Sequence, residues 1–248
     1  QRNDAMRIPR IFTAQPLIAG SSIQLEQGAA RHLSSALRMS VGQSIILFDG
    51  HGGEYSAALT EVKKSKVWVA VNEFSDKDLE SPLKIQLAIG ISRGERMDWI
   101  VQKATELGAT EITPLFTERC EVKLSGERLE KKTRHWQQIA ISACEQCQRN
   151  IVPIVNSAAT IDQYLAGPVI GLKLVLHHRT ENRLTDMTNS NNNIALLVGP
   201  EGGLSDREIV CAIKHDFVSL ALGPRVLRTE TAPLAAISII QSLWGDMG

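Results

Sequence analysis

A glycine-rich loop directly after an aliphatic run is the most specific chemical feature of this sequence. The stretch Leu196–Ser205 reads Leu-Leu-Val-Gly-Pro-Glu-Gly-Gly-Leu-Ser. In an open α/β sheet, ligands bind beyond the carboxyl ends of the strands, so a loop in this position suits a binding site. Glu201 would place a carboxylate there, and close approach of the backbone to a ligand is favoured by three glycines, Gly199, Gly202 and Gly203.

The same loop leads into an expected helix, because Ser205 and Glu208 have the spacing of a capping box. No Gly-Lys-Ser/Thr follows, so the loop is not a P-loop. It also lacks the Gly-x-Gly-x-x-Gly pattern, which disfavours a dinucleotide-binding fold. An ordinary strand-to-helix turn that binds nothing is the alternative that these residues alone leave open.

A second strand ends in Gly-Pro near the C-terminus and runs into a basic loop. The stretch Leu220–Ala232 reads Leu-Ala-Leu-Gly-Pro-Arg-Val-Leu-Arg-Thr-Glu-Thr-Ala, and Thr229 and Thr231 are expected to cap the final helix. Arg225 and Arg228 suit a phosphate or a polarised carbonyl, although solvated loop charges are the alternative. Two such units close together predict one composite pocket.

Metal or disulfide chemistry is not expected. Cys144 and Cys147 form a C-x-x-C pattern, but they lie in a strongly helical stretch without a second pair, so we interpret the thiols as packing groups. His177 and His178 end a strand beside the expected pocket, and a lining role is favoured over metal ligation.

Composition excludes several broad classes. The chain has 248 residues, 43% of them hydrophobic, and its 27 basic and 27 acidic residues give a formal net charge of zero. A protein that coats nucleic acid non-specifically would be strongly basic, whereas selective RNA binding through local patches stays open. No apolar run approaches the ~20 residues of a membrane span. The residues before Met6 are polar and unlike a signal peptide, so reduced cysteines and a cytoplasmic location are expected.

Two domains are expected on either side of a polar, proline-terminated linker at 76–83. Residues 6–75 are predicted to be β-rich, with one helix at Ala29–Met39 and strands at Ile45–Asp49, Tyr55–Val62 and Val67–Phe74. Residues 84–248 alternate strands and helices, which indicates an α/β fold with a mostly parallel sheet covered by helices. The strands are expected at Lys84–Gly90, Glu111–Phe116, Leu172–His177, Ile194–Val198 and Val218–Leu222. The helices are expected at Met97–Leu107, Leu129–Gln148, Asp206–His215 and Ala232–Trp244.

These motifs resemble those of the RsmE family, the 16S ribosomal RNA uridine N3-methyltransferases of the SPOUT superfamily. The resemblance extends over Met6–Gly248, and its most specific parts are the two Gly-Pro loops. It is carried by Arg7–Phe12, His32–Met39, Met97–Gly108, Pro114–Arg119, Gly199–Gly203 and Leu222–Ala232.

The resemblance implies a fold, a cofactor and an assembly. A small PUA-like β-barrel that helps to bind RNA would precede a SPOUT α/β domain with a deep trefoil knot, and family members are homodimers. S-adenosylmethionine would lie bent in the knot. Apolar side chains, with Leu197 among them, would enclose the adenine. The cofactor-binding residues would be Leu176, His177, Val198, Gly199, Pro200, Glu201, Gly202, Gly203, Leu220, Leu222, Gly223, Val226, Leu227, Thr231 and Ala232.

The implied reaction needs help at uracil N3, which is a poor nucleophile until its proton leaves. A cation near O2 or O4 would stabilise the developing anion, with Arg228 as first candidate and Arg225 as second. Glu230 or Glu201 would take the proton, and the sequence does not choose between them. Contacts to RNA phosphates would come from Arg7, Arg10, Arg38, Arg93, Arg119 and Lys123, each of which has a surface charge or local salt bridge as its alternative.

The expected partner is therefore 16S ribosomal RNA, within the assembled small subunit. A SPOUT enzyme that modifies another RNA or another base atom is the main alternative. A non-catalytic RNA-binding factor of ribosome assembly is a second alternative, which the intact Gly-Pro motifs and both arginines disfavour. A nicotinamide oxidoreductase is a distant third.

Overall fold

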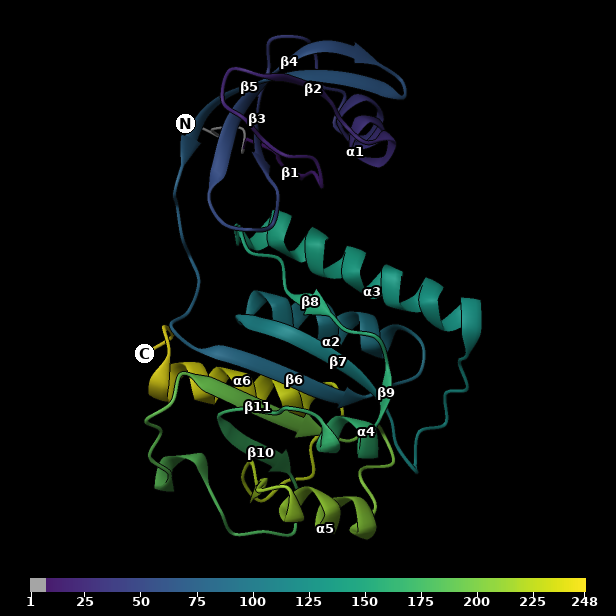
Figure 1. Cartoon of the computed structure of the whole chain (residues 1–248), viewed down its shortest axis with the longest axis vertical. Coiled ribbons are helices and arrows are strands. Elements are labelled where there is room, and N and C mark those ends of the chain that lie inside the picture. The colour runs from purple at the N-terminus through teal and green to yellow at the C-terminus, as the bar shows by residue number, and fades with distance from the viewer. Residues whose placement is uncertain (1–7) are drawn as a thin grey trace. The chain divides into compact units, whose positions relative to one another are not determined.

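The computed structural model describes residues 8–248, and most of its helices and strands are labelled in Figure 1. The chain divides into two compact units. One contains the residues up to Glu80 together with Cys144–Val152, and the other contains Ser81–Ala143 and Pro153–Gly248. The domain limits expected from the sequence stay a prediction. The segment Cys144–Val152 was not expected to belong with the N-terminal residues.

A five-stranded sheet in the order β1-β3-β4-β5-β2 forms the N-terminal unit. The β1–β3 pair is parallel and the other pairs are antiparallel. Alternate residues of the long strands, among them Leu59 and Val69, face a common apolar core. The three long strands were predicted, whereas the two three-residue strands were too short to show a pattern. The strands are β1 (Arg10–Phe12), β2 (Ser22–Gln24), β3 (Ser44–Phe48), β4 (Glu54–Lys63) and β5 (Lys66–Ser75).

The predicted helix at Ala29–Met39 is wrong in its second half. The α-helix α1 (Gln27–Arg31) continues as a π-helix, η1 (His32–Ala36), and the backbone N–H of Leu37 donates to the carbonyl of His32, five residues back. Ala30 and Leu33 are buried, but Leu37 is 42% exposed. A π-turn holds more residues than an α-turn, so it moves Leu37 off the buried face.

Seven strands form the sheet of the second unit, and every pairing in it is parallel. Its order is β12-β10-β11-β6-β7-β8, and β9 also pairs with β7. The predicted parallel sheet is confirmed, while the two-residue strands β8 and β9 were not foreseen. The strands are β6 (Lys84–Gly90), β7 (Ala109–Phe116), β8 (Ile154–Val155), β9 (Ala159–Thr160), β10 (Leu172–Leu176), β11 (Asn193–Val198) and β12 (Val218–Leu220).

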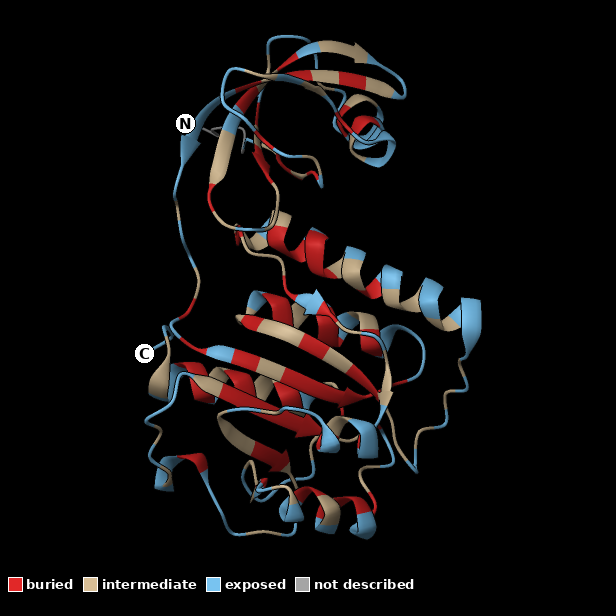
Figure 2. Ribbon diagram, in the orientation of Figure 1, coloured by how far each residue is buried: buried red, intermediate tan, exposed pale blue. Residues whose placement is uncertain are grey.

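Helices cover both faces of this sheet, and so its central strands are buried on both sides (Figure 2). Leu196 of β11 packs in the core formed with α2, α3 and α6, whereas its neighbour Leu197 packs in the core formed with α4 and α5. Two-sided burial explains the continuous aliphatic runs. The helices are α2 (Glu95–Glu106), α3 (Gly126–Cys147), α4 (Ile161–Ala166), α5 (Asp206–Lys214) and α6 (Thr231–Trp244), with a short 3₁₀ helix, η2 (Leu184–Asp186).

Within residues 8–248, no helix combines the length and the apolar character that crossing a membrane requires. The trefoil knot implied by the resemblance stays a prediction.

Candidate active site

A cavity of about 560 Å³ lies at the carboxyl ends of β10, β11 and β12. The two Gly-Pro loops meet in it, as the sequence predicted, although they are about twenty residues apart. All three residues proposed for catalysis line the cavity, and so do all the proposed cofactor residues except Thr231. Four further lining residues were not among them: Arg96, His178, Ala221 and Thr229.

Leu197 does not face this cavity, and the expectation that it encloses adenine is wrong. Its side chain is fully buried in the core with α4 and α5. Val198, the next residue of β11, does line the cavity. Successive side chains of a strand point to opposite faces, so the two residues cannot share one pocket wall.

A close backbone contact presses the glycine-rich loop against the end of β6. A Cβ atom built on Gly90 would lie 2.5 Å from both the ring Cδ and the nitrogen of Pro200. At the other end of the turn, Gly203 has a φ of +69°, and its N–H donates to the carbonyl of Pro200 at 2.8 Å. Gly90 thus makes room for the loop, and Gly203 lets the chain turn towards α5.

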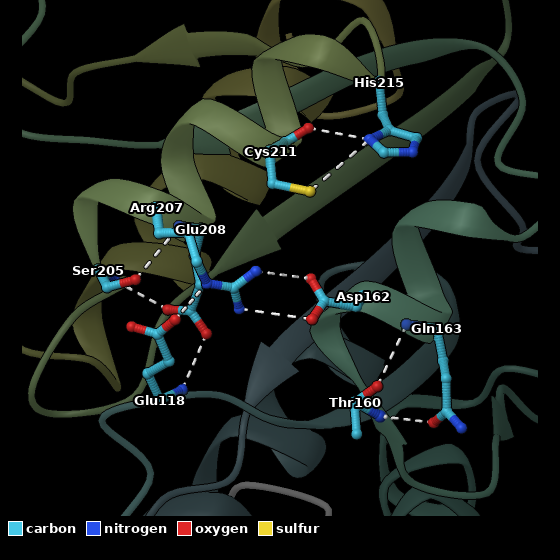
Figure 3. A network of polar contacts seen from close by, with 9 residues as sticks. All are labelled: Glu118, Thr160, Asp162, Gln163, Ser205, Arg207, Glu208, Cys211 and His215. Carbon is cyan, nitrogen blue, oxygen red and sulfur yellow. Dashed lines mark hydrogen bonds and ion pairs between the residues drawn. The ribbon is translucent and has the colours of Figure 1, made fainter.

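Glu208 is the buried anchor of this loop. The predicted capping box is confirmed, since the Glu208 carboxylate accepts from the N–H of Ser205 at 2.8 Å and the Ser205 hydroxyl accepts from the N–H of Glu208 at 3.2 Å (Figure 3). The other carboxylate oxygen accepts from the N–H of Glu118 at 2.8 Å. The side chain is fully buried. One carboxylate therefore joins the start of α5 to the loop that follows β7.

Arginines reinforce the same junction from the surface. Arg207 pairs with the carboxylates of Glu118 and Asp162 (Figure 3). Arg119 donates from Nη1 to the carbonyls of Gly202 at 3.1 Å and Leu204 at 3.3 Å. The guanidinium of Arg119, an expected RNA contact, is thus bonded to the glycine-rich loop itself.

Thr229 ties the second motif to the first, and the prediction that it caps the final helix is wrong. Its hydroxyl donates to the carbonyl of Gly199 at 2.8 Å, and the residue is 8% exposed. The helix α6 begins at Thr231, and Glu230 precedes it without a side-chain cap, so Thr231 is not the cap either. The Thr229 hydroxyl thus bonds to a distant loop carbonyl and not to the backbone at the start of α6, which a capping threonine would contact.

Two carboxylates and three arginines surround the cavity. Glu201 accepts from the backbone N–H of Arg93 at 2.9 Å and from Nη1 of Arg96 at 3.0 Å. Partial burial acts to raise the pKa of Glu201, but these hydrogen bonds and the charge of Arg96 outweigh it, and the pKa is lowered. Glu230 is freer, because its nearest ion-pair contact is Nε of Arg96 at 3.9 Å.

Arg225 and Arg228 are exposed and form no ion pair with any residue from 8 to 248. Both side chains line the cavity and keep their hydrogen-bond donors for a ligand. Directly after β10, burial lowers the pKa of His177, which also lines the cavity, and the neighbouring His178 and Arg179 add to the effect. A neutral imidazole is favoured there at physiological pH.

The expected RNA contacts lie in several places. Arg7 lies outside the described residues, whereas Arg38, Arg93 and Lys123 are exposed, and Arg93 pairs with Glu121. The expectation for Arg10 is wrong. Its side chain is 5% exposed and pairs with Glu54, and Nη2 donates to the Asn150 side chain at 2.6 Å. A buried arginine engaged in this way has no face left for a phosphate.

Two models of known protein families match this chain, and both define it as an RNA methyltransferase. A family model described as an RNA methyltransferase domain matches residues 79–241, and one described as an RNA methyltransferase PUA domain matches residues 25–72. The first contains the whole parallel sheet, and the second contains most of the N-terminal sheet.

Known proteins resemble the chain over almost its entire length. Ribosomal RNA small subunit methyltransferase E of Buchnera aphidicola is 34% identical over 97% of this chain and 98% of its own, and that of Bacillus subtilis is 33% identical over 92% and 93%. A methyltransferase structure from Legionella pneumophila in complex with S-adenosylmethionine is 42% identical, with a TM-score of 0.94, over 97% of this chain and 99% of its own. The small subunit methyltransferase E of Neisseria gonorrhoeae, also bound to S-adenosylmethionine, is 41% identical, with a TM-score of 0.93, over 97% and 100%. The chain belongs to the RsmE family of RNA methyltransferases.

Replacing Gly90 by alanine should displace the glycine-rich loop. The added Cβ would lie 2.5 Å from Pro200, far inside van der Waals contact, and overpacking of this kind costs about 1–3 kcal/mol. Urea denaturation would measure the loss in the free energy of unfolding. Gly28→Ala is the matched control, because no atom lies within 4 Å of a Cβ at that position. Equal stability of Gly90→Ala and the wild type would contradict this account of the loop.

Glu208→Gln should destabilise the second unit although it conserves shape. Two backbone N–H groups donate to the two carboxylate oxygens, and an amide offers one acceptor and one donor, so one N–H would face another donor. The expected cost is about 1–3 kcal/mol in the free energy of unfolding, measured by urea denaturation. Glu130→Gln, on the exposed surface of α3, is the control and should change stability by less than about 0.5 kcal/mol. If Glu208→Gln left the free energy of unfolding unchanged, Glu208 would not anchor the loop.

Proposed function

We propose that this chain methylates N3 of one uridine in 16S ribosomal RNA of the small subunit. The carrying observation is the single cavity that joins the glycine-rich loop to the arginine loop. The names of the full-length relatives, which include small subunit ribosomal RNA methyltransferases E, support the RNA class of substrate. The choice of N3 and of uridine rests on the resemblance found in the sequence.

The residues around the cavity suit S-adenosylmethionine, which supplies a methyl group already activated on a sulfonium sulfur. A volume of about 560 Å³ is in the range of small-molecule pockets. Leucine and valine side chains of β10, β11 and β12 offer apolar walls for an adenine ring, and the backbone of the glycine-rich loop offers polar groups. Two solved structures that resemble this chain at 41–42% identity hold S-adenosylmethionine.

The chain's own side chains would prepare the nucleotide. Loss of the N3 proton spreads negative charge over O2 and O4 of uracil, and a guanidinium can stabilise that charge. Arg228 and Arg225 are free for this role because neither is paired within the described residues. Of the two carboxylates, we assign Glu230 as the base that takes the N3 proton, because Glu201 already accepts two hydrogen bonds.

The substrate must present an unpaired base, because N3 lies on the pairing edge of uracil. The target uridine is therefore in a single-stranded region or leaves its base pair on binding. We propose the assembled small subunit as the form that presents it, in the cytoplasm.

We also propose that the protein acts as a homodimer. The C-terminal helix α6 leaves Ile239 and Leu243 partly exposed, and Trp99 on α2 is 50% exposed. Apolar side chains of this size on neighbouring helices support an interface with a second copy.

The first test uses small subunits from cells that lack this protein, incubated with it and with methyl-labelled S-adenosylmethionine. Mass spectrometry of the digested RNA would identify the labelled nucleoside. Label in 3-methyluridine at one site is the expected result. Label in a different nucleoside would mean that the enzyme methylates another base or another atom of uracil. Binding of S-adenosylmethionine without any label in the RNA would favour a non-catalytic role in assembly.

Arg228→Ala should lower kcat by about 10²–10³-fold, the usual cost of removing one donor to a developing anion. The dissociation constant of S-adenosylmethionine, measured by calorimetry, should stay within about twofold of the wild type, because the side chain is assigned to the nucleotide. Arg128→Ala, at an exposed position of α3, is the control. An unchanged kcat with an intact cofactor site would exclude this role for Arg228.

A further inference from the structure

Arg96 contacts two carboxylates of the cavity wall that belong to different loops. It lies in the first turn of α2, and its Nη1 donates to Oε1 of Glu201 at 3.0 Å. Nε of the same guanidinium is 3.9 Å from Oε2 of Glu230. Glu201 is part of the glycine-rich loop, whereas Glu230 directly precedes α6. One side chain of α2 thus contacts both of the motifs that line the cavity.

The turn before α2 brings Arg96 to this position. Gly94, at the start of the helix, has a φ of +58°, a conformation that favours glycine. The backbone N–H of Arg93 lies 2.9 Å from Oε1 of Glu201, so this one oxygen accepts a hydrogen bond from each side of Gly94. Met97, next to Arg96, is fully buried in the core and fixes the first turn of α2. Arg96 therefore extends from a rigid element, although its side chain is 44% exposed.

Glu230 has no second partner in the part of the chain that the structure describes. Its carboxylate accepts no hydrogen bond there, and Arg96 is its single ion-pair contact. The backbone around Glu230 is fixed, because Thr229 before it bonds to the carbonyl of Gly199 and α6 after it packs in the core. The direction of the Glu230 side chain therefore depends on Arg96.

No other arginine of the cavity wall replaces Arg96 in the described structure. Arg225 and Arg228 form no ion pair with residues 8–248. Burial acts to raise the pKa of Glu201, but hydrogen bonds, among them that of Arg96, and the positive charge of Arg96 outweigh it, and the pKa is lowered. Two neighbouring carboxylates repel each other unless a cation lies close to both. Without Arg96, this repulsion would be left within the wall.

We propose that Arg96 is a positioning residue that holds Glu230 where it takes the N3 proton of the target uridine. The inference rests on the proposed function, in which Glu230 is the base. The N3 proton passes to the Glu230 carboxylate, the N3 electron pair bonds to the methyl carbon, and the electron pair of the sulfur–methyl bond stays on the departing sulfur. Arg96 acts through Glu230 and not through contact with the nucleotide. A base that turns away from its proton slows the chemical step.

The test is a double-mutant cycle between Arg96 and Glu230. Arg96→Gln, Glu230→Gln and the double variant are assayed with unmodified small subunits and methyl-labelled S-adenosylmethionine, and the formation of 3-methyluridine is measured. Arg128→Gln is the control, because it loses the same charge at an exposed position of α3. Urea denaturation of each variant confirms that it is folded.

Arg96→Gln should lower kcat by about 10–100-fold, which is part of what general acid–base catalysis contributes. KM for small subunits and the dissociation constant of S-adenosylmethionine should stay within about twofold of the wild type, because the other supports of the glycine-rich loop remain. With Glu230→Gln already present, Arg96→Gln should change kcat by less than about twofold, since no base is left to position. Arg96→Lys should give an intermediate kcat, because an ammonium keeps the charge but lacks the fork that contacts both carboxylates.

A second measurement does not depend on activity. NMR of protein labelled at the glutamate carboxyl carbons would follow the titration of Glu201, whose signal is identified by its loss in Glu201→Gln. The pKa of Glu201 should rise in Arg96→Gln, since this variant removes a hydrogen bond and a positive charge that lower it. Arg128→Gln should leave the titration unchanged. The same titration in Arg96→Gln and the wild type would overturn the inference.

Three kinetic results would overturn the inference while the proposed reaction stands. Effects of Arg96→Gln and Glu230→Gln that multiply would make Arg96 a structural residue. A rise in KM or in the dissociation constant of S-adenosylmethionine at constant kcat would make it a ligand contact. Full activity of Glu230→Gln would leave Arg96 without a base to position. A wild type that transfers no methyl group to RNA would overturn the proposed function and the role of Arg96 together.

Discussion

Much of the second unit depends on how the glycine-rich loop is held between β11 and α5. The loop must expose its backbone to the cavity, so it cannot be stabilised by side chains of its own on that side. The loop is held by hydrogen bonds from side chains outside the cavity. They involve the buried carboxylate of Glu208, the guanidinium of Arg119 and the hydroxyl of Thr229. A rigid site on a loop needs this kind of support, because an unsupported loop would lose its shape whenever the cavity is empty.

The charges around the cavity divide into supporting and available groups. Arg96 binds Glu201 and lies near Glu230, so it stabilises the wall, whereas Arg225 and Arg228 in the basic loop form no ion pair within residues 8–248. A reaction that creates negative charge on a base requires free cations close to a fixed wall. The arrangement therefore suits stabilisation of an anion.

The N-terminal unit places its charges by a different rule. Its buried arginines have structural roles, because Arg10 forms an ion pair with Glu54 and Arg149 forms a bidentate ion pair with Glu80. Its exposed cations collect where a π-helix meets a hairpin turn. Burial thus separates two sets of basic residues that look alike in the sequence. A buried structural arginine and a solvent-exposed arginine differ in their neighbours and not in their type.

Local sequence pattern determined the parallel sheet, most helices and the capping box, because strand and helix periodicity and turn chemistry act over a few residues. It also indicated that the two Gly-Pro loops meet in one pocket, because each follows a strand of the same parallel sheet. Tertiary structure alone decided which side chains reach across the chain. It brought Arg96 to the cavity from a helix about a hundred residues away, turned Thr229 from a cap into a link to Gly199, and buried Arg10. The physical reason is that such bonds depend on which groups the packing leaves unpaired, and no short stretch of sequence contains that information.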